Sequence, residues 1–202
     1  SIKSFGPDCL LIYDRYFDSQ QSALQPIQTW IKKFPHRLSL TSGESLKDLA
    51  RKIEELGLGE KSAFLATALS LENELTGKSF GIEGYLFPDT YYFSKKDKAE
   101  GIIKKMHARL LSKLAPEILA RINELNSNVH EVLTLASIIE KETGNPSERS
   151  IIASVYKNRL RLGMRLQADP TVIYGIEGYD GKIRKKDLLK AHPYNTYKIT
   201  GL

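Results

Sequence analysis

Cysteine is nearly absent from the sequence, since Cys9 is the only one among 202 residues. A single cysteine excludes a disulfide bond within the chain and a zinc site built from several cysteines. Long apolar runs are also missing, and none approaches the ~20 residues of a membrane-spanning helix. The chain has neither an initiator methionine nor a signal-peptide pattern, so we expect a processed form or a fragment.

The overall composition is that of an ordinary globular protein. Hydrophobic residues make up 41% of the chain and charged residues 27%, and both values argue against disorder. A length of 202 residues is enough for one large domain or two small ones, with a core that needs no disulfide or metal.

Basic residues outnumber acidic ones by 30 to 24, which gives a formal net charge of +6. Such an excess suits nucleic acid, a membrane surface or another anionic polymer, or simply a solvated surface. The basic residues are scattered, and their densest run, 182–190, accompanies no recognition-helix or RNP-like pattern. Nucleic acid is therefore the least favoured of these partners, and we predict none.

Several common catalytic and metal-binding patterns are missing as well. The sequence contains no Gly-x-Ser-x-Gly, Walker A or Gly-x-Gly-x-x-Gly motif. His192 has no second metal ligand at a suitable spacing, and the acidic residues are too scattered for a calcium loop, as Asp18, Asp97 and Asp180 show. We therefore predict no cofactor and no metal site.

Hydrophobic periodicity predicts an α+β fold whose second half is mainly helical. In the first half we expect a strand at 10–17, a short helix at 25–34, a strand at 37–41, helices at 46–56 and 60–71, and an aromatic loop with short strands at 81–93. A weak change of pattern suggests a domain boundary near 58–62. In the second half we expect a helix capped by Ser94, helices from Pro116, at 128–143 and at 145–162, an irregular stretch at 167–181 and a basic helical stretch near Leu188.

The helix expected at 128–143 has well-defined ends and two distinct faces. Asn128 and Glu131 resemble a capping box that opens it, and Gly144 ends it. At about 100° per residue, a polar stripe of His130, Thr134, Ser137 and Lys141 lies opposite an apolar face of Val132, Leu135, Ile138 and Ile139.

Two glutamates of this helix are expected at different depths. Glu142 stacks over Leu135 and Ile138 at the flank of the apolar face, whereas Glu140 lies nearer the opposite border, where we expect it exposed or paired. Glu142 also lies in the last turn, where the helix dipole disfavours a negative charge. Burial and the dipole together would favour a protonated carboxyl group, which is what a general acid needs.

The pattern alone leaves other interpretations open. A glutamate near a helix end is usually a boundary residue paired with a lysine or arginine, and this applies to Glu142 and Glu140. The aromatic residues at 85–93, with Tyr194 and Tyr197, could form core, or they could offer ring faces to sugars.

Four stretches of the sequence, in the same order, resemble the signatures of one enzyme family. They are 83–91 (EGYLFPDTY), 135–143 (LASIIEKET), 154–175 (SVYKNRLRLGMRLQADPTVIYG) and 194–202 (YNTYKITGL). By these motifs the chain resembles the endolytic murein transglycosylases, the MltG or YceG-like family. A shorter stretch, 43–50, resembles the start of a LysM-type glycan-binding module.

The resemblance implies an activity and a place in the cell. Members of the family are lyases that cut the glycan strands of peptidoglycan between N-acetylmuramic acid and N-acetylglucosamine and so limit strand length. One N-terminal helix, absent from this chain, holds them in the bacterial inner membrane with the enzyme domain in the periplasm. Glycan polymerases of cell-wall synthesis are the protein partners that the resemblance implies.

The resemblance also implies a mechanism with one catalytic carboxylate. Glycosidases that use water usually pair two carboxylates. Here Glu142, the second glutamate of the Glu-Lys-Glu-Thr motif, would protonate the glycosidic oxygen and then take the proton from the C6 hydroxyl of muramic acid, which attacks C1. The product is a 1,6-anhydro end, and neither a cofactor nor a metal is needed.

Around Glu142 we expect polar and aromatic residues of the four motifs, because amides suit N-acetyl groups and tyrosines offer ring faces and hydroxyls. Asn158 and Asp169 could instead hold loops in place. The expected substrate-binding residues are Glu83, Tyr85, Asn158, Gln167, Asp169, Tyr194 and Asn195.

The expected architecture has three parts: an unassigned segment at 1–36, a small, partial LysM-like module at 37–60, and a mainly helical catalytic domain with short strands at 61–202. Because the family's chains continue past the final Thr-Gly-Leu, we expect this domain to be truncated at its C-terminus. Two other functions stay open. One is a non-catalytic module that binds peptidoglycan; the other is a pyridoxal-phosphate-dependent aminodeoxychorismate lyase, for which the sequence shows no phosphate-binding loop.

Overall fold

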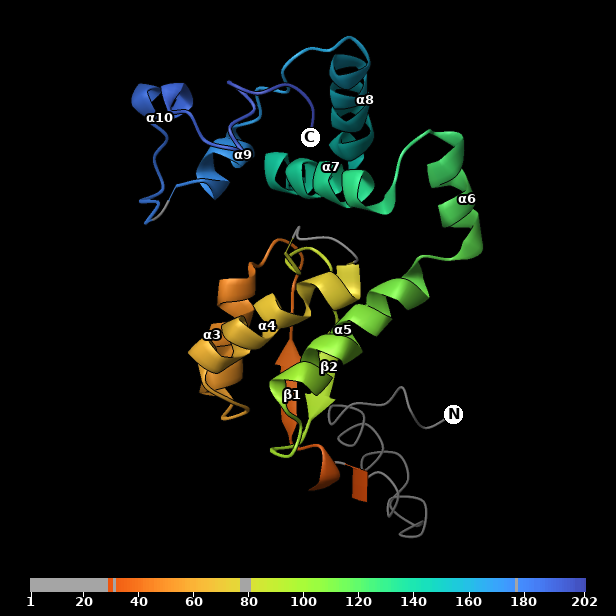
Figure 1. Ribbon diagram of the computed structural model, residues 1–202, viewed down its shortest axis with the longest axis vertical. Coiled ribbons are helices and arrows are strands. Elements are labelled where there is room, and N and C mark those ends of the chain that lie inside the picture. The colour runs from red at the N-terminus through yellow and green to blue at the C-terminus, as the bar shows by residue number, and fades with distance from the viewer. Residues whose placement is uncertain (1–28, 31, 77–80, 177) are drawn as a thin grey trace. The chain divides into compact units, whose positions relative to one another are not determined.

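The computed structural model describes residues 29–30, 32–76, 81–176 and 178–202 (Figure 1). The strand predicted at 10–17 lies outside the described residues, as do Cys9 and most of the helix predicted at 25–34. The described part of that helix, residues 29–30 and 32–33, is helical. The chain divides into two compact units, residues 1–110 and 111–202.

The first unit contains a two-stranded antiparallel sheet of β1 (His36–Ser39) and β2 (Thr90–Phe93). The register places His36 opposite Phe93. Because side chains alternate along a strand, β2 buries Tyr91 together with Phe93 and turns the residues between them outward. The strand predicted at 37–41 and a short strand within 81–93 are thus confirmed.

Two helices connect these strands and pack against each other. They are α3 (Leu46–Glu55) and α4 (Lys61–Thr76). Ser45 caps α3, because its hydroxyl accepts the Asp48 N–H while the Asp48 carboxylate accepts the Ser45 N–H. These two helices, on either side of the boundary suggested near 58–62, belong to the same compact unit, and that boundary stays a prediction.

The next helix, α5 (Ala99–Lys113), buries Ile102, Ile103 and Met106. The prediction that Ser94 caps this helix is wrong. The Ser94 N–H donates to the Asp97 carboxylate at 2.6 Å, so Ser94 opens a separate turn that precedes α5.

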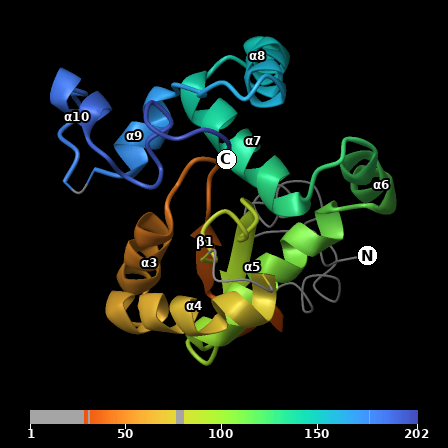
Figure 2. The ribbon, with the colours of Figure 1, turned by 45° about the horizontal axis from the view of Figure 1, so that its top comes forward.

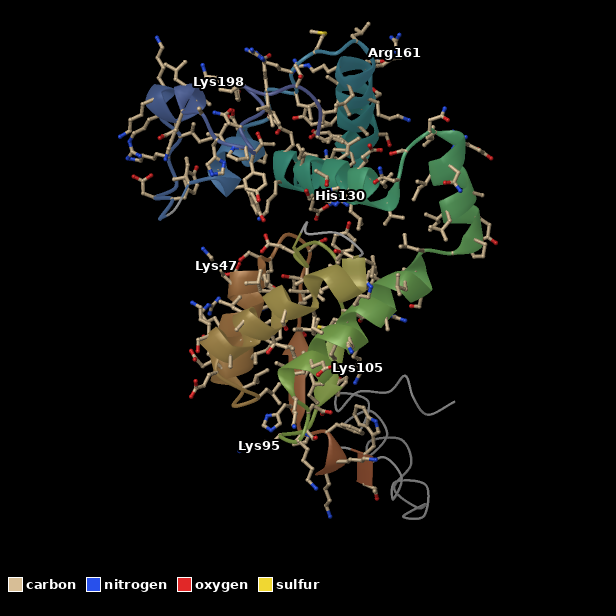
Figure 3. The ribbon with its side chains drawn as sticks, viewed as in Figure 1. Lys47, Lys95, Lys105, His130, Arg161 and Lys198 are labelled. Carbon is tan, nitrogen blue, oxygen red and sulfur yellow. The ribbon has the colours of Figure 1, made fainter. Side chains whose placement is uncertain are left out.

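The second unit is mainly helical, as predicted. Its elements are α6 (Pro116–Glu124), α7 (Val129–Glu142), the 3₁₀ turn η2 (Pro146–Glu148), α8 (Arg149–Arg161), α9 (Asp169–Tyr174) and α10 (Lys185–Leu189). The capping box of Asn128 and Glu131 is present at the start of α7. Figures 1 and 2 both show α7 beside α8 and α9. Figure 3 labels His130 on α7 and Arg161 on α8.

A small core holds the C-terminal half of α7 in place. Ile138 and Ile139 of α7 pack with Tyr156 of α8 and with Leu166 and Ala168, which follow α8. Leu166 and Ala168 are almost completely buried. Leu166 and Ala168 therefore anchor the irregular segment after α8 against the C-terminal half of α7.

Helix α9 corrects one prediction. The stretch 167–181 is predicted to be irregular, but Asp169–Tyr174 is helical. Pro170 lies in its first turn, where a missing N–H removes no hydrogen bond of the helix. Six residues are too few for hydrophobic periodicity to reveal a helix.

Within the described part of the chain, no helix is both long enough and apolar enough to cross a lipid bilayer.

Candidate active site

Glu142 is the last residue of α7, and its side chain is exposed. Its predicted burial is wrong. The apolar face of α7 reaches the core at Ile138 and Ile139, whereas Glu142 lies one turn beyond Ile138, past the edge of that core. The carboxylate at this edge is accessible from solvent.

Glu140 is the more buried of the two glutamates, although it was expected nearer the border of the polar face. Its side chain is 28% exposed and forms an ion pair with Arg149 of α8, with 2.9 Å between Arg149 Nη2 and Glu140 Oε2. The expectation that Glu140 is paired is confirmed, and the relative depth of the two residues is reversed.

Tyr156 lies in the packed core near Glu142. Its ring belongs to the cluster that holds the C-terminal half of α7. Burial and the nearby Glu142 carboxylate raise the pKa of Tyr156 to about 12, and the Arg159 charge opposes them. The phenol is therefore uncharged at neutral pH.

Tyr197 and Asp169 form a hydrogen-bonded phenol–carboxylate pair. The Tyr197 hydroxyl donates to Asp169 Oδ1 at 2.7 Å. This hydrogen bond, burial and the charges of Asp169 and Glu142 raise the pKa of Tyr197 to about 12, again against the charge of Arg159. Glu142 and Asp169 therefore share an electrostatic environment with two protonated tyrosines and one arginine.

A closed ring of hydrogen bonds between buried residues supports the Asp169–Tyr197 pair. The Ala168 N–H donates to Thr196 Oγ1 at 3.0 Å, the Thr196 and Thr171 hydroxyls are 2.8 Å apart, and Thr171 Oγ1 donates to the Ala168 carbonyl at 2.7 Å. All three residues are buried. The ring joins the third and fourth motifs of the sequence, immediately before Asp169 and Tyr197.

Asn195 is placed as a structural support and not at a surface. It is 1% exposed, and its amide nitrogen donates to the backbone carbonyls of Leu188 at 3.2 Å and Lys190 at 2.7 Å. Its side-chain oxygen accepts the Tyr197 N–H at 2.9 Å. With donors and acceptor engaged, the amide holds Tyr197 against the α10 region and has no free group for an N-acetyl substituent.

Asn158 and Gln167 are exposed, but they lie differently with respect to Glu142. Asn158 is two residues from Tyr156 on α8, a rotation of about 200° that turns it to another side of the helix. Gln167 precedes α9 with an unusual φ of 52°, and its N–H donates to the Thr196 carbonyl at 3.2 Å. Gln167 is thus held within the segment that carries Asp169.

Tyr194 belongs to an exposed group of aromatic rings. It is 52% exposed and meets Tyr174, which is 57% exposed, edge to face at 4.8 Å between ring centroids. The His192 ring lies 5.2 Å from Tyr194 and accepts the Tyr194 N–H at 3.3 Å. Two large aromatic surfaces are therefore available to a ligand beside each other.

Gly175 makes room for this aromatic group. A Cβ atom on Gly175 would lie 2.6 Å from His192 Nδ1, well inside van der Waals contact. We expect Gly175→Ala to reduce the free energy of unfolding by about 1 kcal/mol, as overpacking does when a side chain can still swing away. Thermal unfolding of the single variants and of Gly175→Ala with His192→Ala measures this. The double variant should recover the loss caused by Gly175→Ala, and equal losses in both backgrounds would contradict the contact.

The two site residues predicted in the first unit both have structural partners there. Glu83 accepts the Leu46 N–H at 2.9 Å, at the first turn of α3. Tyr85 is 8% exposed, and its carbonyl oxygen contacts the His107 ring nitrogen at 3.2 Å. Burial raises the pKa of the Tyr85 phenol. A substrate contact of either residue stays a prediction.

The sequence did not identify Tyr156 and Arg159 as members of the site, and it left open whether Tyr197 is a core residue or a ligand contact. A signal for the first two was available: they are three residues apart on a predicted helix, so they share a face. No local signal relates that face to Glu142. In the described residues there is no group of three or more His, Cys, Asp or Glu side chains that could bind a metal.

Comparisons with known proteins place the chain in a family. The model of the YceG-like family matches residues 16–202. The protein named endolytic murein transglycosylase in Bacillus subtilis (strain 168) is 43% identical over 122 residues, which cover 60% of this chain and 34% of that protein. Its namesake in Streptococcus pneumoniae (strain D39) is 34% identical over 160 residues, which cover 76% of this chain and 29% of that protein.

A solved structure agrees with these matches. The crystal structure of a yceG-like protein from Listeria monocytogenes superposes with a TM-score of 0.75 at 34% identity, over 91% of this chain and 66% of that chain. The chain spans about a third of the length of the curated relatives it matches. Since the family model covers nearly all of the sequence, from residue 16 to residue 202, the chain belongs to the YceG-like family.

Proposed function

We propose that this chain carries the catalytic region of a lytic transglycosylase that cleaves peptidoglycan glycan strands between N-acetylmuramic acid and N-acetylglucosamine. The observation that carries the proposal is the exposed carboxylate of Glu142 at the end of α7, next to the packed core of that helix. The names of the related proteins, endolytic murein transglycosylase, support the same reaction.

Glu142 acts first as an acid and then as a base. The protonated carboxyl group gives its proton to the glycosidic oxygen, the bond to C1 of muramic acid breaks, and an oxocarbenium-like centre develops. The carboxylate then accepts the proton of the C6 hydroxyl, whose oxygen bonds to C1. Because the attacking hydroxyl belongs to the same sugar, a high effective molarity replaces the activated water of a hydrolase.

The substrate contacts that we propose combine the predicted residues with their observed positions. Tyr194, with its neighbour Tyr174, offers exposed ring faces to the sugars, and the exposed Gln167 offers an amide to an N-acetyl group. Asn195 supports the site from within, as its buried hydrogen bonds indicate. Asn158 is exposed and stays a candidate for a more distant sugar.

Residues 37–60, within the first unit, are proposed as a small, partial LysM-like glycan-binding module. Its motif at 43–50 opens α3, and Glu83 of the first transglycosylase-like motif accepts a hydrogen bond at that helix start. The two motifs are thus packed together, which supports a shared function. We also propose action in the periplasm at the bacterial inner membrane, with glycan polymerases as partners, on the basis of the family resemblance.

A second candidate function is binding of peptidoglycan without cleavage, which the exposed Tyr174 and Tyr194 rings would also suit.

One experiment separates cleavage of peptidoglycan from binding without cleavage. The purified protein is incubated with peptidoglycan sacculi, and the soluble products are analysed by mass spectrometry. Our proposal requires new glycan ends with a 1,6-anhydro bond. Sacculi that bind the protein but release no such ends would support the binding module, and absorbance near 420 nm would reveal a pyridoxal-phosphate enzyme.

A further inference from the structure

The chain leaves α7 directly after Glu142. Thr143, the next residue, has an extended backbone with φ −139° and ψ 137°, although its N–H still donates to the Ile139 carbonyl at 3.3 Å. The packed core of α7 ends at Ile138 and Ile139, so Glu142 lies beyond it. The position of Glu142 therefore also depends on how the residues after it are held.

Thr143 is held by a carboxylate that lies five residues later in the chain. Its hydroxyl donates to Glu148 Oε2 at 2.6 Å and accepts the Asn145 N–H at 3.0 Å. The other carboxylate oxygen, Glu148 Oε1, accepts a side-chain N–H of Asn145 at 3.2 Å. Within this turn the hydroxyl thus both donates and accepts, and each oxygen of the carboxylate has a partner.

The same turn leads into α8. Asn145 caps the 3₁₀ turn η2, because its side-chain oxygen accepts the Ser147 N–H at 3.1 Å, and its backbone carbonyl accepts the Glu148 N–H at 3.1 Å. Glu148 is the residue directly before α8, which packs against α7. The hydrogen bond from Thr143 to Glu148 therefore ties the end of α7 to the start of α8.

We propose that Thr143 and Glu148 are positioning residues, whose hydrogen bond fixes the backbone that follows Glu142 and so holds the catalytic carboxyl group in place. This inference rests on the proposed function of Glu142. Because Thr143 is joined to Glu142 by a peptide bond, a change in its backbone conformation moves the end of α7. A displacement of about 1 Å in an active site can cost about 100-fold in rate.

Helix α7 carries a matched hydrogen bond at its other end. The Ser127 hydroxyl donates to Glu131 Oε2 at 2.7 Å, and this pair also joins a half-buried hydroxyl residue to an exposed glutamate. The two ends of the 14-residue helix are about 20 Å apart at 1.5 Å per residue. The Ser127 pair therefore offers the same chemistry on the same helix, far from Glu142.

The test uses the whole protein and five variants: Thr143→Val, Thr143→Ser, Glu148→Ala, the double variant Thr143→Val with Glu148→Ala, and Ser127→Ala. Release of anhydro-ended products is measured at limiting and at saturating glycan. Thr143→Val and Glu148→Ala should lower the rate at saturation by roughly 10- to 100-fold, with little change in KM. The double variant should be about as slow as the slower single, because both substitutions remove one interaction.

Two variants distinguish positioning from a general loss of stability. Thr143→Ser keeps the hydroxyl that donates to Glu148, so it should keep most of the rate. Ser127→Ala removes a hydrogen bond of the same kind from α7 and should cleave at the unaltered rate. The unfolding midpoint of each variant is measured alongside, so that rates are compared only where the protein is folded.

Failure of this inference and failure of the proposed function give different results. If the unaltered protein releases no anhydro-ended product, the proposed function fails and this inference fails with it. If the unaltered protein is active, but Thr143→Val cleaves at the unaltered rate or Ser127→Ala loses as much rate as Thr143→Val, the inference alone is overturned. A raised KM with an unchanged rate at saturation in Thr143→Val would also overturn it, because Thr143 would then contact the substrate.

Discussion

Replacing Glu142 by Gln is expected to lower the release of anhydro-ended glycan by ~10²–10⁴-fold, the usual contribution of a general acid–base group. Gln has the shape of a neutral carboxylic acid but no proton to transfer at this step. Because Gln has nearly the same size as Glu and the side chain is exposed, the end of α7 should keep its structure. Mass analysis of digested sacculi measures the loss, and the unfolding midpoint confirms that the variant is folded.

Glu140→Gln is the matched control for this experiment. Both glutamates lie in the last turn of α7, but Glu140 is held by Arg149 at 2.9 Å, whereas Glu142 is exposed. Loss of this partly exposed ion pair should reduce stability slightly and leave the cleavage rate within a few-fold of normal. Normal cleavage by Glu142→Gln together with inactivity of Glu140→Gln would show that the wrong carboxylate has been assigned.

The type of product tests the mechanism independently of the residue. An intramolecular attack by the C6 hydroxyl leaves a 1,6-anhydro end, whereas attack by water leaves a reducing end that is heavier by one water. Hydrolysis would require a second group to activate water, and hydrolases usually place a second carboxylate for that purpose. Reducing ends as the main product would therefore contradict the lytic mechanism. Asp169 would then be the candidate for the second carboxylate.

The boundaries of α7 could be predicted from the sequence, because its signals are local. Asn128 and Glu131 satisfy each other's backbone donors within one turn, and the structure contains that capping box. Such signals need no knowledge of the rest of the chain. The same holds for Ser45 and Asp48 at the start of α3, where the helix was predicted within one residue.

The depth of Glu140 and Glu142 could not be predicted in this way. A helical projection shows which residues share a face, but it does not show where along the axis the packed core ends. Here the core ends at Ile138 and Ile139, so Glu142, one turn later, is exposed. The site depends on contacts between four segments, and those contacts are fixed only by the tertiary fold.

Asn195 is another residue whose role depends on the tertiary fold. An asparagine in a polar motif suits an N-acetyl group, and its sequence gives no sign that three carbonyls of the α10 region surround its amide nitrogen. Motif membership therefore identified the right segment but not the role of this side chain. Its neighbour Thr196, which sequence analysis did not single out, has an equally structural position.

Replacing Thr196 by Val is expected to lower the free energy of unfolding of the second unit by about 1–3 kcal/mol. Val has nearly the same shape, so the variant removes the hydroxyl without opening a cavity. Thr196 is 4% exposed and Ala168 is 1% exposed, so the Ala168 N–H that loses its acceptor stays buried without a partner. Thr171 also loses its contact with the Thr196 hydroxyl.

Thr196→Ser is the matched control, because it keeps the hydroxyl and removes only a methyl group. It should cost less than Thr196→Val, although a buried methyl group is itself worth about 1 kcal/mol. Urea denaturation measures both variants, and a shift of the midpoint at constant slope identifies a true change of stability.

The same substitution should also slow catalysis, because the ring that includes Thr196 lies directly before Asp169 and Tyr197. If the hydrogen-bond ring fixes the positions of Asp169 and Tyr197, Thr196→Val should reduce cleavage at temperatures where the protein is still fully folded. Thr196→Ser should not. A Thr196→Val variant as stable as Thr196→Ser would show that the hydroxyl ring contributes nothing net. Reduced stability with unchanged cleavage would show that the Asp169–Tyr197 pair is held by Asn195 and the α10 region instead.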